Sequence, residues 1–108
     1  MTGRPNFLIF MVDQCNSTLF SRDGPADFLH VPNLRRLYSE GVNFANTYCA
    51  SPLCAPSRAS FMSGLLPSRT GVYDNAAEFA SSIPTFAHHL RRAGYDTTLS
   101  GKMHFVGP

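Results

Sequence analysis

Charge is scarce in this sequence. Only 15% of the residues are Asp, Glu, Lys or Arg, and the formal net charge is +2, whereas 44% of the residues are hydrophobic. A disordered interaction tail would show the opposite balance. The nine Lys and Arg residues are scattered along the chain rather than clustered, which argues against a nucleic-acid surface built on bulk charge. The composition therefore predicts a folded domain without a nucleic-acid partner.

Long hydrophobic runs are also missing. The longest unbroken apolar run extends from Phe7 to Val12, whereas a membrane-spanning helix needs about 20 residues. The run is too short for the core of a secretory signal, and Asp13 ends it without a small-residue cleavage site. We therefore expect a cytoplasmic protein that does not associate with membranes.

Cysteines are few and do not form a framework. There are three, Cys15, Cys49 and Cys54, so the number is odd, and no short spacing repeats. A disulfide-stabilised secreted domain is therefore not expected, and the pattern suits a reducing compartment.

The segments that are present alternate between strands and helices. The continuous run from Phe7 to Val12 predicts a strand that is buried on both faces. Alternating apolar and polar residues predict two shorter strands, over residues 42–44 and 95–99. Prolines and glycines predict helices, because proline favours a helix start and glycine a helix end. The expected helices cover residues 32–40, about 56–63 and 84–93, with turn-rich or irregular segments at 15–31 and 65–82.

This alternation is typical of an α/β protein with a mostly parallel sheet flanked by helices. Such sheets usually have about five or six strands, and the sequence predicts only three. We therefore expect residues 1–108 to be the N-terminal portion of a larger catalytic domain, with the remainder after residue 108.

Three polar clusters stand where an α/β sheet collects ligands, at strand ends and helix starts. Asp13 and Gln14 follow the first predicted strand, and Lys102 and His104 follow the last. The segment Cys54–Arg58 precedes or opens a predicted helix, where free N–H groups and the helix dipole favour negative charge. Together these residues indicate an anion site with a sulfur nucleophile and a carboxylate for a hard cation.

Each cluster also has a simpler interpretation. Asp13 at a strand end is compatible with a turn residue, and Cys54 before Ala-Pro with a small buried hydrophobe. Lys102 and His104 are too sparse to indicate a site on their own. The residues alone leave these alternatives open.

Four motifs occur in the order found in type I sulfatases. Cys54–Arg58 resembles the Cys-x-Pro-Ser-Arg motif of that family, and the likeness continues through residues 59–69. The opening segment, residues 4–13, is similar to the family's first strand. Gly101-Lys102-Met103-His104 matches the family's Gly-Lys-x-His motif. A narrower resemblance to choline sulfatases rests on residues 23–30, 72–78 and 101–108.

The resemblance implies an alkaline-phosphatase-like α/β sandwich and a modified nucleophile. In the family, a maturing enzyme oxidises the cysteine that corresponds to Cys54 to Cα-formylglycine. The hydrate of this aldehyde, a geminal diol, attacks the sulfur of a sulfate ester. The second hydroxyl of the diol then expels sulfate. The substrate implied by the narrower resemblance is choline sulfate, a small molecule that is hydrolysed to choline and inorganic sulfate.

The resemblance also assigns roles to single residues. Asp13, Gln14 and the converted Cys54 would ligate a divalent metal, with calcium expected and magnesium or manganese as alternatives. Gln14 stands where many sulfatases have a second Asp. Arg58 and Lys102 would hold the diol and the sulfate oxygens, and His104 would orient the second hydroxyl or assist its deprotonation. Asn75 would contact the sulfate.

Two other hypotheses remain open. Asp-Gln also occurs in phosphonate monoester hydrolases, so the chain could belong to a phosphonate monoester or phosphodiester hydrolase on the same scaffold. The alternative of a different class is a non-catalytic binding domain in which Cys54 stays a thiol. A homo-oligomer is expected for the full-length protein.

Overall fold

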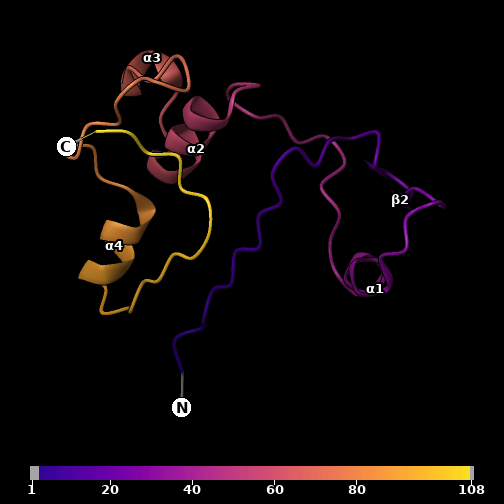
Figure 1. Ribbon diagram of the computed structural model, residues 1–108. Coiled ribbons are helices and arrows are strands. Elements are labelled where there is room, and N and C mark those ends of the chain that lie inside the picture. Colours follow the sequence, from indigo (N-terminus) through magenta and orange to yellow (C-terminus); the bar gives the residue numbers. More distant parts are fainter. Residues whose placement is uncertain (1–2, 108) are drawn as a thin grey trace. The chain divides into compact units, whose positions relative to one another are not determined.

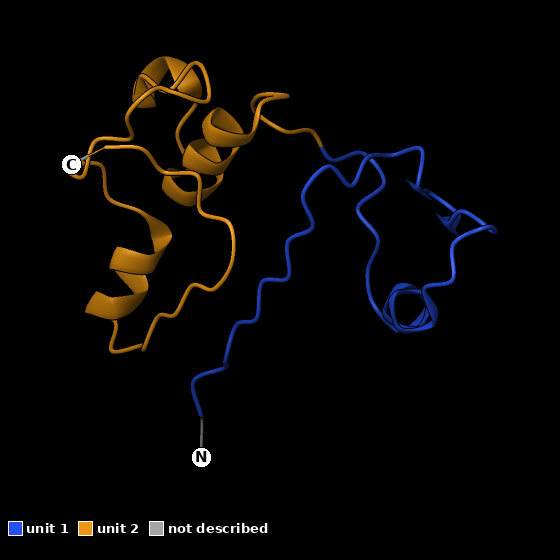
Figure 2. Ribbon diagram, in the orientation of Figure 1, with its two compact units in different colours: residues 1–47 blue, residues 48–108 orange. Residues whose placement is uncertain are grey.

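The computed structural model describes residues 3–107, and they form two compact units that divide between Thr47 and Tyr48 (Figure 2). Pro108, the last residue of the choline-sulfatase-like motif, lies outside the described residues. None of the helices in the described part is both long and apolar enough to span a membrane. The elements in chain order are β1 (Phe20–Ser21), β2 (Gly24–Pro25), α1 (Pro32–Glu40), α2 (Cys54–Ser63), α3 (Pro67–Thr70) and α4 (Phe86–Arg92), as Figure 1 shows.

The first unit is a short hairpin joined to one helix. Strands β1 and β2 pair antiparallel, with Phe20 opposite Pro25. The guanidinium of Arg35, on α1, donates hydrogen bonds to the carbonyls of Pro25 and Ala26 at 3.0 and 2.8 Å. The hydroxyl of Tyr38 donates to the carbonyl of Arg22 at 3.1 Å. Side chains of α1 therefore hold a hairpin in a segment that the sequence predicted only as turns.

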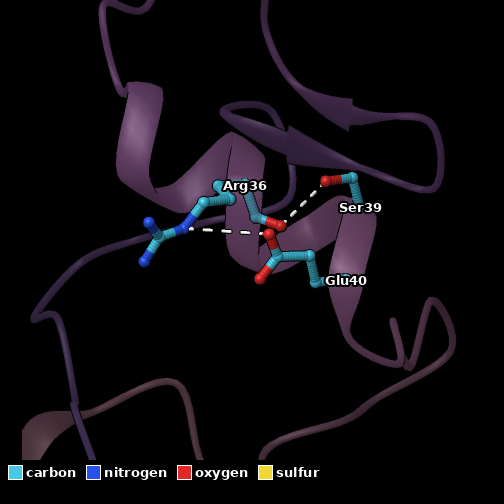
Figure 3. Close-up of polar contacts among 3 residues, drawn as sticks. All are labelled: Arg36, Ser39 and Glu40. Carbon is cyan, nitrogen blue, oxygen red and sulfur yellow. Dashed lines mark hydrogen bonds and ion pairs between the residues drawn. The ribbon is translucent and has the colours of Figure 1, made fainter.

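Helix α1 has the predicted bounds. It starts at Pro32 and ends before Gly41. On its exposed face, Arg36 Nε lies 4.0 Å from Glu40 Oε1, and Ser39 Oγ donates to the carbonyl of Arg36 at 2.8 Å (Figure 3). An exposed pair of this kind contributes only about 0.3–0.5 kcal/mol, so the contacts of α1 with the hairpin matter more.

The three predicted strands, of which only residues 7–12 were expected to be buried on both faces, are wrong for the described structure. Residues 7–12 form no strand, and their side chains are exposed, up to 93% for Leu8. Residues 42–44 and 95–99 are not strands either. A parallel strand needs hydrogen-bonded neighbours that are distant in sequence. Among the described residues these three segments are not strands, so their apolar pattern does not produce a sheet.

Helix α2 begins at Cys54, two residues earlier than the sequence predicted. Pro56 is tolerated in the first turn because its missing N–H would have no partner within the helix. The helix ends as predicted at Gly64, whose φ of 72° is left-handed and whose N–H donates to the carbonyl of Ser60 at 2.8 Å. Glycine adopts this conformation without the steric cost that a Cβ would add.

The hydrophobic core of the second unit lies along one face of α2. Ala55 and Ala59, one turn apart, are 2% and 0% exposed, and Val72 is 1% exposed. Ala77 and Phe79 pack against this cluster. Because the two helix residues are alanines, the segment after α3 can approach the helix backbone closely. The core therefore fixes the loop of residues 72–79 beside the first turn of α2.

Two other helical segments differ from the prediction. Helix α3 lies within residues 65–82, which the sequence predicted as irregular. Helix α4 begins at Phe86 rather than Pro84, because Thr85 caps it: His88 Nδ1 lies 3.1 Å from the Thr85 N–H and 2.8 Å from its hydroxyl. Phe61 of α2 and Phe86 of α4 pack edge to face, with ring centroids 5.7 Å apart. This contact joins α4 to α2.

The C-terminal segment returns to the loop after α3. Glu78 and Val106 form an isolated parallel bridge, in which the N–H of Phe79 donates to the carbonyl of Val106 at 2.7 Å. The rings of Phe79 and Phe105 lie 5.3 Å apart. These contacts hold the residues that directly follow Lys102–His104 against the same loop that packs on α2 (the C-terminal segment is yellow in Figure 1).

Candidate functional site

The site begins with two side chains on one face of α2. Cys54 is the first residue of the helix, and Arg58 follows four positions later. Residues at this spacing lie one above the other, one turn apart. Both side chains are half-buried. The Cys-x-Pro-x-Arg spacing therefore places a sulfur and a permanent positive charge side by side at the helix start.

Lys102 contacts both Cys54 and Arg58, although it is far from them in the sequence. Its Nζ lies 3.5 Å from Cys54 Sγ, a contact between residues 48 positions apart. The Arg58 guanidinium donates to the backbone carbonyl of Lys102 at 2.7 Å. Arg58 thus holds the backbone of Lys102, while the Lys102 ammonium reaches the sulfur. The structure brings together three of the residues that the sequence predicted as catalytic.

Asn75 reaches the same helix start from the loop after α3. Its Oδ1 accepts a hydrogen bond from the N–H of Ala55 at 3.0 Å. The sequence predicted Asn75 as a sulfate contact and missed this hydrogen bond to the backbone. A signal was available, because Leu53 precedes the helix and has no side-chain oxygen for the orphan N–H groups.

His104 has two unusual features. Its φ is 55°, which is left-handed, and Gln14 with φ 57° is the only other non-glycine residue with positive φ in the part of the chain described. The His104 Nδ1 atom is buried and has no hydrogen-bond partner among the described residues. Strained backbone and unsatisfied buried groups cluster at functional sites. Both features single out His104, and the positive φ also singles out Gln14; their roles at the site stay predictions.

Asp13 and Gln14 belong to the first unit, whereas Cys54 belongs to the second. Their neighbouring carboxylate and amide oxygens are hard donors, which suit a hard divalent cation. A thiol does not suit such a cation, whereas an oxygen made from Cys54 would. The described residues contain no gathered group of three or more His, Cys, Asp or Glu side chains. The donor set thus fits the predicted metal in chemistry.

All three cysteines are free, as the sequence predicted. Cys15 and Cys49 are exposed, and only Cys54 is partly buried. Its place at the start of α2 beside Lys102 distinguishes it from the other two.

Comparison with known proteins agrees with the motifs. The model of the Sulfatase family matches residues 5–106. The chain is 72% identical to a choline-sulfatase from Rhizobium meliloti (strain 1021), over 99% of this chain and 21% of the relative. It is 36% identical to an arylsulfatase from Clostridium perfringens (strain 13 / Type A), over 94% of this chain and 21% of the relative. It is 34% identical to an N-acetylgalactosamine-6-sulfatase from Mus musculus, over 93% of this chain and 22% of the relative.

The chain spans about a fifth of the length of the curated relatives it matches. The match confirms the predicted resemblance, including its narrower form, and implies the α/β fold of the alkaline-phosphatase type. The two-stranded hairpin of the described residues does not itself show that sandwich. With a family match over nearly its whole length, this chain belongs to the sulfatase family.

Proposed function

We propose that residues 1–108 are the N-terminal portion of the catalytic domain of a sulfuric ester hydrolase. Its proposed substrate is choline sulfate, which it hydrolyses to choline and inorganic sulfate. The observation that carries this proposal is the approach of Lys102 Nζ to Cys54 Sγ at the N-terminus of α2. The high identity to a choline-sulfatase supports the choice of substrate.

The proposed nucleophile derives from Cys54, which a maturing enzyme oxidises to Cα-formylglycine. The aldehyde supplies, as its hydrate, an attacking oxygen and a route for releasing sulfate. Cys54 is half-buried and lies at the start of a helix, where backbone N–H groups and the dipole favour negative charge. This environment suits an anionic substrate group better than an apolar one.

Lys102 and Arg58 are the proposed cationic partners. Lys102 places its ammonium next to the side chain of residue 54 and would hold a sulfate oxygen. Arg58 holds the Lys102 backbone through its 2.7 Å hydrogen bond and adds a second positive charge one turn along α2. Losing one preorganised donor to developing charge typically costs about 2.7–4 kcal/mol, so both residues matter for the rate.

His104 is the proposed proton-transfer residue, and Asn75 the proposed neutral contact to sulfate. Positioned acid–base catalysis contributes about 10²–10⁴-fold. The buried Nδ1 of His104 without a partner is available for a proton or a hydrogen bond. With Oδ1 of Asn75 on the Ala55 N–H, its amide Nδ2 is the end that would donate to sulfate.

Asp13, Gln14 and the oxygen-bearing form of residue 54 are the proposed ligands of a divalent metal, with calcium the first choice. Such a metal, when bound, lowers the pKa of an attacking hydroxyl and polarises a substrate oxygen. Asp13 would supply charge, and Gln14 a neutral oxygen. The remaining ligands would follow residue 108. We also propose a cytoplasmic location and a homo-oligomeric full-length protein.

Substrate competition tests the proposed activity. The full-length protein should hydrolyse choline sulfate faster than an aryl sulfate, and both faster than a phosphonate monoester. Gln14 is the feature that favours the phosphonate hydrolase, because the Asp-Gln pair occurs in such enzymes. A preference for the phosphonate ester would overturn the proposal in favour of that enzyme.

Mass spectrometry of the peptide around residue 54 tests the nucleophile. Protein from its native host should carry the aldehyde at this position. An alkylatable thiol in fully active protein would contradict the proposed mechanism. A thiol in protein without hydrolase activity would favour the binding domain.

A further inference from the structure

The N-terminus of α2 is capped from outside the helix. Leu53, at the N-cap position, makes no side-chain capping hydrogen bond. Asn75 does so instead: its Oδ1 accepts from the Ala55 N–H at 3.0 Å, across 20 positions of sequence. Helices usually obtain this cap from a Ser, Thr, Asp or Asn at the N-cap itself. The start of α2 therefore depends on a loop that is distant in sequence.

Among the N–H groups at the start of α2, Asn75 accepts from that of Ala55 and not from its neighbours. The Leu53 N–H donates to Ser51 Oγ at 3.3 Å, and Pro56 has no N–H. Within residues 3–107, the N–H of Cys54 has no hydrogen-bond acceptor. The cap of Asn75 thus acts on the peptide unit that directly follows residue 54.

This peptide unit is rigid. The Ala55 N–H and the Cys54 carbonyl carbon share one plane with the Cα atoms of both residues. Fixing the direction of the N–H therefore restricts rotation of the plane that carries Cα of residue 54. That restriction in turn limits the direction in which the side chain of residue 54 leaves the backbone.

We propose that Asn75 is a positioning residue for residue 54, acting through the Ala55 N–H; this inference rests on the proposed function. The hydrogen bond holds the residue 54 side chain in line with Lys102 Nζ, 3.5 Å away. Lys102 is exposed and has a flexible stem, so it is less suited to provide the alignment. The loop of Asn75 is better suited, because Val72, three positions earlier, is 1% exposed in the core beside Ala55.

The two ends of the Asn75 amide allow a selective test. Oδ1 is the acceptor that caps the helix, whereas Nδ2 is a donor. Asn75→Asp keeps an acceptor for the Ala55 N–H but removes the donor and adds a negative charge. Asn75→Ala removes both ends. If the cap through Oδ1 positions residue 54, the alanine variant loses more kcat than the aspartate variant. If Asn75 acts only through a contact between Nδ2 and sulfate, the aspartate variant loses at least as much kcat as the alanine variant, because it also adds a negative charge beside the anion.

The experiment measures kcat and KM for choline sulfate with full-length protein, after conversion of residue 54 has been quantified by peptide mass spectrometry. A misplacement of about 1 Å can cost about 10²-fold in rate. We expect Asn75→Ala to lower kcat at least about tenfold per converted site. Asn75→Asp should keep a higher kcat than Asn75→Ala because it retains the cap, and its own fall in kcat and rise in KM relative to wild type report the sulfate contact.

Ser63→Ala is the matched control. Ser63 Oγ accepts from the Leu65 N–H at 3.2 Å and donates to the Ala59 carbonyl at 2.7 Å, at the opposite end of α2. It should lower the melting temperature without changing kcat. The positioning role is overturned if Asn75→Ala keeps the wild-type kcat, or if Asn75→Asp loses as much kcat as Asn75→Ala. Wild-type protein that is fully converted but inactive on sulfate esters would instead refute the proposed function.

Discussion

The two units differ in how their apolar residues are used. In residues 48–107, Ala55, Ala59 and Val72 form a buried cluster, and the catalytic candidates Cys54, Arg58 and Lys102 converge beside it. In residues 3–47, the most apolar segment, residues 7–12, is exposed. A helix makes its backbone hydrogen bonds internally, whereas a parallel strand obtains them from distant segments. A helix-based site can therefore assemble within a short chain, as can the local antiparallel hairpin of β1 and β2, whereas a parallel sheet needs strands from distant segments.

This difference also divides the proposed chemistry. The residues proposed to act on sulfate, with the exception of the metal ligands, lie in the second unit. Asp13 and Gln14, proposed to hold the cation, follow the exposed apolar segment of the first. The proposed metal ligands Asp13 and Gln14 therefore lie in the unit whose predicted strand is not formed among the described residues.

The largest loss of activity is expected when Cys54, the proposed nucleophile in the second unit, is replaced. Cys54→Ala should lower hydrolysis of choline sulfate by about 10⁴-fold or more, since removing a nucleophile abolishes the step that all other groups assist. The fold should persist because Cys54 is outside the hydrophobic cluster. Steady-state rates and thermal unfolding of full-length protein measure both effects. Cys49→Ala, an exposed thiol, is the control; unchanged activity of Cys54→Ala would refute the assignment.

The next largest loss of activity is expected when Asp13, a proposed metal ligand in the first unit, is replaced. Asp13→Ala should lower metal content, measured by inductively coupled plasma mass spectrometry, and lower activity by at least about 10²-fold, because losing a carboxylate ligand removes charge from the site. Asp23→Ala, an exposed aspartate in the hairpin turn, should change neither. Full metal occupancy in Asp13→Ala would show that the first unit does not supply this ligand.

Two substitutions, one in the buried cluster of the second unit and one in the exposed apolar segment of the first, test why the units differ. They ask whether residues 7–12 are exposed because the strands that would pair with them lie outside this chain. Val72→Ala should cost about 2 kcal/mol of unfolding free energy in the 108-residue chain, where Val72 is 1% exposed, and we expect a similar cost in the full-length protein. Leu8→Ala should cost about 3 kcal/mol in the full-length protein only, where the predicted strand would be buried. In the 108-residue chain it should change stability by less than about 0.5 kcal/mol.

Denaturant unfolding of the four proteins checks these values. A neutral Leu8→Ala in the full-length protein would mean that residues 7–12 are not a buried strand there. The exposure of residues 7–12 would then be a property of the first unit's own sequence, and not a result of leaving out the rest of the protein.

The smallest effect separates backbone strain from side-chain chemistry at His104. Because its φ is 55°, His104→Gly should be about 1 kcal/mol more stable than His104→Ala, while both lose activity. At the neighbouring Met103, whose φ is not positive, the order should reverse, since glycine costs about 0.5–1 kcal/mol relative to alanine in ordinary conformations. Thermal unfolding measures both pairs. Equal stabilities of the two His104 variants would exclude strain at this position.

Local signals were sufficient for much of the helical structure. Pro32 and Gly41 delimit α1, and Gly64 ends α2, because caps and breakers act within a few residues. The four-residue spacing of Cys54 and Arg58 was enough to place them one turn apart on a helix. The starts of α2 and α4 were mispredicted by two residues, because the prolines lie near rather than at the boundary.

The sequence by itself determined these helix ends, the residue types of the site and membership of the sulfatase family. Only the tertiary structure decided that Lys102 reaches Cys54 across 48 positions and that Asn75 caps α2 across 20. The reason is physical: helix periodicity and capping depend on neighbours within a turn or two, whereas closing a loop depends on packing between distant segments. Here the cluster of Ala55, Ala59 and Val72 and the Glu78–Val106 bridge provide that packing.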